Sequence, residues 1–200
     1  VMRDSKYIGT VMKKETSPIN LAKMMVGREV LLNVKKQKVK AEEIILEVKD
    51  IFVPSERELS KIRGLSFELR RGEILGIAGV DGNGQKELVE AITGLREVEK
   101  GEIFFKKEKI TNKSPKLIRD RGISHIPDDR NVRGLNRELD ISENLISTKF
   151  TQKRFSNTIN LKFGEISKFS EEMIEKLDIR PNNSKIKVKN LSGGNTQKEV

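Results

Sequence analysis

Cysteine and tryptophan are absent from this 200-residue sequence, and tyrosine occurs only once. Without cysteine the chain has no disulfide bond and no thiolate metal site, which fits a reducing compartment. The shortage of Tyr and Trp leaves few rings on which nucleic-acid bases could stack. No apolar run approaches the length of a membrane span, and no signal peptide is visible. These absences argue against secreted, disulfide-stabilised and membrane-spanning classes of protein.

The chain is strongly basic, with 40 Lys and Arg against 30 Asp and Glu and a net charge of +10. Such a charge can attract nucleic acid, anionic membranes or phosphate ligands. The lysines are scattered, however, and the densest run, VKKQKVK over residues 34–40, is typical of a linker. We therefore interpret the charge as a solvated surface and expect no nucleic-acid partner.

A short unit precedes the part of the chain that carries the motifs. Residues 1–10 predict a β-hairpin. The stretch SPINLAKMMVG predicts a helix, because Ser17 is a good N-cap, Pro18 fits the first helical position and Gly27 is a typical stop. Charged residues follow, and a second unit starts near Ile44.

Beyond Ile44 the pattern alternates strands, loops and helices. IILEVKDIFV and LSFELR predict strands, and ILGIAG predicts a buried parallel strand. ELVEAITGL predicts a helix, followed by a strand GEIFF, a short helix capped by Ser114 and a strand GISHI. Residues 133–190 predict mostly helix, with Ser142 as a cap. One longer helix carries an apolar stripe, formed by Ile166, Phe169, Met173, Ile174 and Leu177.

The sequence GVDGNGQKEL, residues 79–88, joins the ILGIAG stretch to the following helix. A phosphate-binding loop requires that context, because its backbone N–H groups curl around a phosphate at the start of a helix. Gly79 and Gly84 fill the two glycine positions of the usual pattern G-x-x-x-x-G-K-[ST], with Gly82 and Asn83 between them. A dinucleotide-binding loop does not fit, because position 87 is not glycine.

The charged and hydroxyl positions of this pattern are altered. Gln85 stands in the lysine position, Lys86 in the Ser/Thr position, and Glu87 comes next. Gln85 can donate to a phosphate but carries no charge, a loss of about 1–3 kcal/mol. Lys86 would repel the Mg²⁺ that a hydroxyl normally holds. We expect this loop to bind nucleotide weakly or not at all; the alternative is a glycine-rich turn with no ligand.

A second motif, LSGGNTQ, covers residues 191–197. LSGGQ-type sequences are the signature of ABC ATPases, and with GVDGNGQKEL upstream the chain resembles an ABC nucleotide-binding domain. Asn195 stands where Gln is commoner. Taken alone, LSGG could be a Ser-capped helix start after a loop. The signature residues are Leu191, Ser192, Gly193, Gly194, Asn195 and Gln197.

The closer resemblance is to the second ATPase domain of the tandem subunits in sugar and nucleoside ABC importers. RGEILGIAGVDGNGQ, ISHIPDDR, ENL and LSGGNTQK carry it, and the opening residues resemble the tail of the first ATPase domain. The resemblance implies a first-domain tail over residues 1–30 and a linker over 31–43. The N-terminal part of a second domain would cover 44–200, with a helical subdomain at about 133–190.

The implied fold is of the α/β class: a P-loop NTPase-like ABC ATPase domain with an antiparallel β subdomain, a partial parallel core sheet and a helical subdomain. In this family two ATPase domains meet head to tail, and each ATP lies between the P-loop of one and the LSGG of its partner. Ser192, Gly193 and Gly194 offer suitable donors for a γ-phosphate. ATP with Mg²⁺ is the implied ligand of the full complex, and we expect it to bind weakly or not at all at this chain's own loop.

Asp128, in ISHIPDDR, aligns with the Q-loop glutamine of the family, which reaches the metal and the attacking water. The alternative for residues 128–130 is a polar turn with a local ion pair. The stretch expected to face adenine, residues 54–56, has no aromatic side chain, and Phe52 is a poor substitute. We interpret His125 as a strand residue.

The resemblance also implies partners and a location. The partners are the preceding ABC domain of the same chain, transmembrane permease subunits docking near Asp128 and the helical region, and indirectly a solute-binding protein. The location is the cytoplasmic face of the membrane. The Walker B aspartate, the catalytic glutamate and the switch histidine would lie beyond Val200. We therefore assign no catalytic residue and no metal ligand, and expect this stretch alone not to hydrolyse ATP.

Two other interpretations remain. Some cytosolic tandem ABC proteins bind ribosomes, and a charge of +10 would suit RNA. The degenerate glycine loop and the short linker argue against that class. A glycine-rich scaffold domain that binds no nucleotide is the other possibility.

Overall fold

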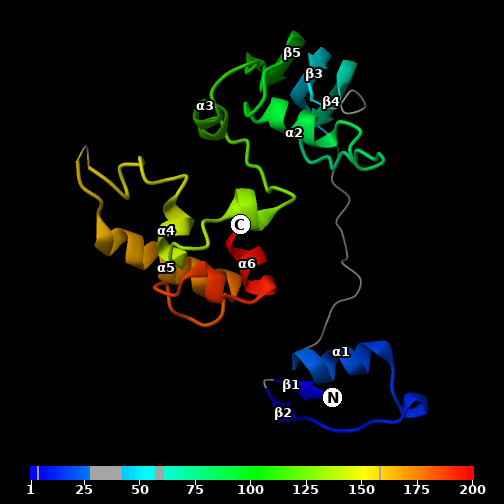
Figure 1. Cartoon of the computed structure of the whole chain (residues 1–200), viewed down its shortest axis with the longest axis vertical. Coiled ribbons are helices and arrows are strands. Elements are labelled where there is room, and N and C mark those ends of the chain that lie inside the picture. Colours follow the sequence, from blue (N-terminus) through cyan, green and yellow to red (C-terminus); the bar gives the residue numbers. More distant parts are fainter. Residues whose placement is uncertain (4, 28–41, 57–60, 158) are drawn as a thin grey trace.

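The computed structural model describes residues 1–3, 5–27, 42–56, 61–157 and 159–200. Figure 1 shows these residues as a hairpin with α1, a sheet with α2 and α3, and a cluster of helices α4, α5 and α6. Most of the predicted linker lies outside the described residues. Within them, no helix combines the length and apolar character needed to cross a bilayer.

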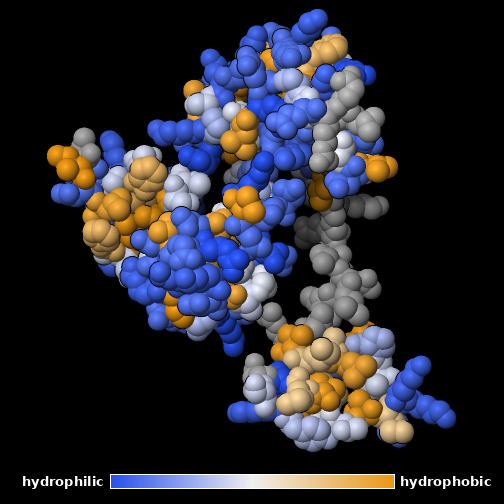
Figure 2. Space-filling view, viewed as in Figure 1, coloured by the Kyte–Doolittle hydropathy of each residue, from blue (hydrophilic) through white to orange (hydrophobic). Residues whose placement is uncertain are grey.

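The first group forms as the sequence predicts. Its elements are β1 (Met2–Arg3), antiparallel β2 (Lys6–Tyr7), the 3₁₀ helix η1 (Lys13–Glu15) and α1 (Pro18–Val26). The Ser17 hydroxyl caps α1 by accepting from the Asn20 N–H at 3.2 Å, and Gly27 ends it with a φ of +81°. None of the described residues up to Gly27 is buried. Figure 2 shows apolar side chains on the surface of this group. Met12 and Met25 are among its exposed apolar residues.

Four strands form the main sheet, in the order β4-β3-β5-β6, and every neighbouring pair is antiparallel. The strands are β3 (Ile44–Val53), β4 (Ile62–Arg70), β5 (Lys100–Phe105) and β6 (Glu108–Lys109). The first three confirm the predicted strands, whereas β6 is too short to show a pattern. Val48 lies opposite Phe67 on one side and Ile103 on the other, which aligns apolar side chains across the sheet.

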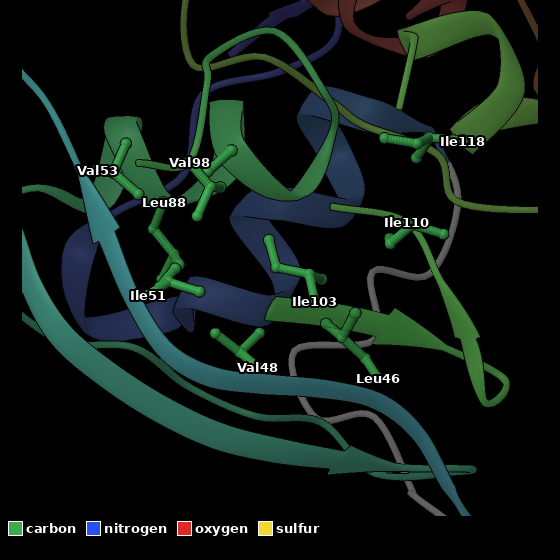
Figure 3. Packing of buried hydrophobic residues seen from close by; sticks show 10 residues of the cluster. Leu46, Val48, Ile51, Val53, Leu88, Val98, Ile103, Ile110 and Ile118 are labelled. Atoms are coloured by element: carbon green, nitrogen blue, oxygen red, sulfur yellow. The ribbon is translucent and has the colours of Figure 1, made fainter. Parts of the chain in front are cut away.

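Helix α2 (Gln85–Ile92) packs against the sheet. Helix α3 (Pro115–Asp120) lies beside the sheet and contributes Ile118 to the same core. Side chains from β3, β5 and α2 point into one core (Figure 3). Burying each such aliphatic side chain contributes roughly 1.5–3 kcal/mol. Ser114 caps α3 as predicted, with its hydroxyl accepting from the Leu117 N–H. The core comprises Leu46, Val48, Ile51, Val53, Leu88, Ala91, Val98, Ile103, Ile110 and Ile118.

The third group is helical. Its elements are the π-helix η3 (Arg130–Gly134), α4 (Ile141–Ile146), α5 (Phe163–Leu177), the 3₁₀ helix η4 (Val188–Asn190) and α6 (Gly193–Glu199). The predicted stripe on α5 is mostly correct, because Ile166, Phe169 and Ile174 are buried. The Phe155 ring lies 5.0 Å from that of Phe169. Leu177, at the end of the helix, is partly exposed.

Two predicted strands are wrong. The ILGIAG and GISHI stretches have no strand structure, and Ile74 and Ile126 are each 77% exposed. A parallel strand is stable only when a neighbouring strand satisfies its backbone groups. All strand pairs among the described residues are antiparallel. The expected partial parallel sheet is therefore not formed in the described part of the chain, and His125 lies in irregular backbone rather than in a strand.

The predicted cap of α4 is also wrong. Asp140, not Ser142, precedes the helix, and its carboxylate accepts from the Glu143 N–H at 2.9 Å. The Glu143 carboxylate accepts in return from the Asp140 N–H at 2.9 Å. This reciprocal pair satisfies two backbone donors, more than a serine alone can. Residues 133–190 also contain more turns than predicted, because irregular segments separate α4, α5 and η4.

Candidate functional site

The glycine loop leads directly into α2. Gly84 is the N-cap of the helix with a φ of +99°, and Gly82 has a φ of +83°. Only glycine adopts such angles without strain, which explains both residues. The Asn83 N–H donates to the Val80 carbonyl at 3.2 Å and closes the turn. The backbone of the loop thus turns directly into the helix, as the glycine pattern predicts.

The side chain of Gln85 folds back over this loop. Its Nε2 donates to the Val80 carbonyl at 3.2 Å. A Cβ atom placed on Gly79 would collide with the same amide, so Gly79 makes the room that Gln85 uses. One of the two N–H donors of the Gln85 amide is therefore engaged within the loop.

The next two residues also differ from those of a loop that binds a phosphate and a metal ion. Lys86 is exposed in the first turn of α2. Glu87 is 7% exposed and accepts from the Ser55 hydroxyl at 2.9 Å. Its carboxylate already complements the positive end of the helix, where a phosphate would otherwise bind. Among the described residues, no three His, Asp or Glu side chains gather to hold a metal. Lys86 thus stands where a hydroxyl would hold Mg²⁺ in the usual loop.

Asp128 lies in a hydrogen-bonded polar turn. Its exposed carboxylate accepts from the Asp129 N–H at 2.9 Å. The Asp129 carboxylate caps η3 by accepting from the N–H groups of Asn131 and Val132, at 2.9 and 3.2 Å. The polar turn of the alternative interpretation is thus present, without an ion pair to Arg130 among the described residues. Both carboxylates remain near the surface.

Sequence reasoning missed a charged cluster centred on Glu90. This residue of α2 is 5% exposed, and its two carboxylate oxygens accept from different arginines. Oε2 accepts from Arg96, with Nη2 at 2.7 Å, and Oε1 accepts from Nη1 of Arg133, which belongs to η3. Arg96 also donates to the Pro54 carbonyl at 3.0 Å. The cluster therefore joins α2 to both the residue 54 segment and η3.

Electrostatics keep Glu90 ionised despite its burial. Burial raises the pKa of Glu90, but the hydrogen bonds and charges of Arg133 and Arg96 outweigh it and hold the pKa below its usual value. One signal in the sequence could have revealed this: Glu90 sits between the buried Leu88 and Ala91, where a charge requires a partner.

The signature residues begin α6 at the surface. Ser192 is the N-cap, and its hydroxyl accepts from the backbone N–H and the Nδ2 of Asn195, at 3.4 and 3.0 Å. Ser192, Gly193, Gly194 and Gln197 are exposed. Leu191 instead packs against the apolar cluster of α4 and α5 and anchors the motif. The serine and glycine donors face outward and can meet a partner molecule.

The segment containing Asp128 lies next to α6. A Cβ atom on Gly193 would come within 3.2 Å of the Arg130 guanidinium. A Cβ on Gly134 would likewise meet the Val200 side chain at 3.2 Å. The structure thus brings the 128–134 segment and the signature together.

A cavity of about 840 Å³ lies between these elements and the sheet group. Glu90, His125, Arg133 and Glu199 contribute to its lining. Neither the glycine loop nor Ser192 lines it. The glycine loop and the signature serine therefore lie outside this cavity.

A glycine loop before one helix and an exposed Ser-Gly-Gly before another are the two features that the sequence singled out. The family model described as ABC transporter matches residues 62–199. The chain belongs to the ABC transporter family. Across its full length it is 38% identical to the glucose import ATP-binding protein TsgD13 of Haloferax volcanii. It is 37% identical to the nucleoside import ATP-binding protein NupA of Lactococcus lactis. The chain spans 37% and 40% of the lengths of these two ABC relatives.

Solved structures of ABC proteins agree with this assignment. The TM-score is 0.61 with the ATP-binding cassette MJ0796 in a dimeric post-hydrolysis state bound to ADP and Pi, at 21% identity over 78% of this chain and 66% of that one. It is 0.56 with the ADP conformation of the cassette MJ1267, at 22% identity over 79% and 63%. These likenesses confirm the predicted ABC ATPase fold and its α/β class. The antiparallel sheet and the helical group are the parts formed here.

Proposed function

We propose that this chain is part of the ATP-binding, energy-coupling subunit of an importer for sugars or nucleosides. ABC relatives named for glucose and for nucleoside import align with its whole length and support the solute class. The exposed start of α6 carries the proposal, because Ser192, Gly193 and Gly194 present donors to solvent that suit a phosphate of ATP.

The proposed role is asymmetric. The signature serves the ATP held by the P-loop of the preceding ABC domain, whereas this chain's own loop binds nucleotide weakly. Three observations support the second half: the Gln85 amide bonds within its loop, Lys86 occupies the hydroxyl position, and Glu87 places a carboxylate at the helix start. ATP bound at the signature would carry Mg²⁺ held by that other domain.

The partners follow from the same proposal. The preceding ABC domain completes the composite site, and transmembrane permease subunits dock on the Asp128 turn and the adjoining helices, at the cytoplasmic face of the membrane. A solute-binding protein acts indirectly through the permease. The exposure of Asp128 and the proximity of its segment to the signature support a docking role.

A pair of variants in the complete transporter tests the asymmetry. Ser192→Arg fills the signature with a long side chain and should lower ATP turnover by at least about 100-fold, the scale of lost transition-state donors. Gln85→Ala removes a bond within a weak site and should change turnover by less than about threefold. Steady-state phosphate release measures both. Equal losses from the two substitutions would contradict the proposal.

A further inference from the structure

Asn195, in the first turn of α6, links the signature to the end of α5. Its Nδ2 donates to the Ser192 hydroxyl at 3.0 Å and to the Arg180 carbonyl at 2.6 Å. Its Oδ1 accepts from the Arg180 N–H at 3.0 Å. A backbone N–H only donates and a carbonyl only accepts, so the two bonds to Arg180 fix which end of the amide faces Ser192. The nitrogen must be that end.

This orientation determines what the Ser192 hydroxyl can do. A serine oxygen has two acceptor positions and one O–H donor. The side chain and the backbone N–H of Asn195 both donate to it, at 3.0 and 3.4 Å, and occupy the acceptor positions. Among the described residues, the Ser192 O–H donates to no protein group. The hydroxyl is left as a donor, and phosphate oxygens at neutral pH are chiefly acceptors.

The anchor of Asn195 is itself firmly held. Arg180 follows Ile179, which is 1% exposed and packs with Ile141 and Ile174. The Arg180 guanidinium also donates to the Asp178 carboxylate at 3.0 Å. On the other side of the link, the Thr196 hydroxyl donates to the Ser192 carbonyl at 3.0 Å. The amide is therefore fixed between a buried segment and the signature.

We propose that Asn195 is a positioning residue, which fixes the Ser192 hydroxyl as a hydrogen-bond donor toward a terminal phosphate of ATP on the neighbouring domain. It acts through Ser192 and does not contact the nucleotide. The inference rests on the proposed function, in which the signature binds ATP.

The test uses the complete transporter and measures kcat and KM for ATP. Asn195→Asp keeps the size and the acceptor for Arg180 but presents a carboxylate to Ser192, which would take the hydroxyl proton away from the phosphate. We expect kcat to fall by about 10-fold or more, with a smaller change in KM. Asn195→Ala, which leaves the hydroxyl free to rotate, should lower kcat by only about threefold.

A double-mutant cycle separates positioning from a structural role. If Asn195 acts through Ser192, Asn195→Ala should cost nothing further once Ser192→Ala is present. Thermal unfolding of each variant checks the fold, and the alanine cycle decides the question if Asn195→Asp does not fold.

Different results would overturn the role of the signature in ATP binding and the positioning role of Asn195. Unchanged turnover in Ser192→Ala would overturn the proposed role of the signature. A loss in Ser192→Ala together with fully additive effects, or an unchanged kcat in Asn195→Ala and Asn195→Asp, would overturn the positioning role alone.

Discussion

At the start of α2 a single amide occupies the space that a phosphate-binding lysine would leave open. Gln85 bonds to the Val80 carbonyl and lies against Gly79, so the loop is partly filled by its own side chain. A phosphate at this loop would gain no charged contact from residue 85. The glycines keep the backbone angles of a phosphate loop, so the proposed weak binding rests on the side chains.

Titration of labelled ATP onto this 200-residue chain tests that interpretation. We expect a Kd above about 100 μM, changing less than about threefold when Mg²⁺ is added. The double variant Gln85→Lys with Lys86→Ser restores the usual pattern and should bind at least about 10-fold more tightly, with a clear dependence on Mg²⁺. Micromolar, strongly Mg²⁺-dependent binding of ATP by the natural sequence would contradict the proposal that this loop binds nucleotide weakly.

Glu199 makes stability depend on pH. It is 7% exposed, and neither carboxylate oxygen has a partner among the described residues. Burial, with the negative charge of Asp140, raises the pKa of Glu199 to about 7. The pKa of a glutamate in an unfolded chain is about 4.3. Between these values the folded state binds more protons than the unfolded state, so the free energy of unfolding falls as pH rises and levels off above about 7.

Glu199→Gln should therefore stabilise the protein at pH 8, by roughly 1–2 kcal/mol, and have little effect at pH 5. Urea unfolding at the two pH values measures the difference. Glu175→Gln, on the exposed side of α5, is the matched control and should change the free energy of unfolding by less than about 0.5 kcal/mol at either pH. An equal gain from Glu199→Gln at both pH values would contradict the assignment.

At the scale of elements, the link between α2 and η3 depends on one carboxylate. Glu90→Ala leaves two guanidinium groups without their buried partner and should cost about 2–4 kcal/mol of unfolding free energy. Arg133→Ala removes a partner that is 43% exposed and should cost about 1 kcal/mol. Chemical denaturation of both variants provides the comparison. A smaller loss from Glu90→Ala than from Arg133→Ala would show that the carboxylate does not organise the cluster.

The sequence predicted elements well where the deciding interactions are local. Ser17, Ser114 and Ser192 were recognisable as caps because each bonds to the turn that follows it. β3 and β5 were recognisable from their apolar pattern. ILGIAG failed because a parallel strand depends on a distant partner, which local pattern cannot supply. Ser142 failed because Asp140 and Glu143 form a reciprocal cap that outcompetes it.

The candidate site shows the same contrast between local and long-range interactions. Both glycine-containing motifs could be recognised in the sequence. Positive φ angles and close approach of the backbone to a ligand require glycine, and the motifs place it at a fixed spacing. The bond between Asn195 and Arg180 and the cluster around Glu90 could not be recognised, since each joins residues that are far apart in the sequence. The two glycine-containing motifs could therefore be found in the sequence, but the side-chain contacts around them could not.

At the scale of the whole molecule, apolar surface remains open. Ile74 and Ile77, before the glycine loop, and Val80, within it, are each more than half exposed. Ile126 is exposed beyond α3. An exposed apolar stretch of this kind favours association between molecules.

The shared carboxylate of Glu90 has a mechanical consequence. Its two arginines come from different segments, and α2 itself begins at the glycine loop. A displacement of residues 130–134 would therefore reach α2 through the ion pair between Arg133 and Glu90. It would move the helix that starts at Gly84, and with it the end of the glycine loop.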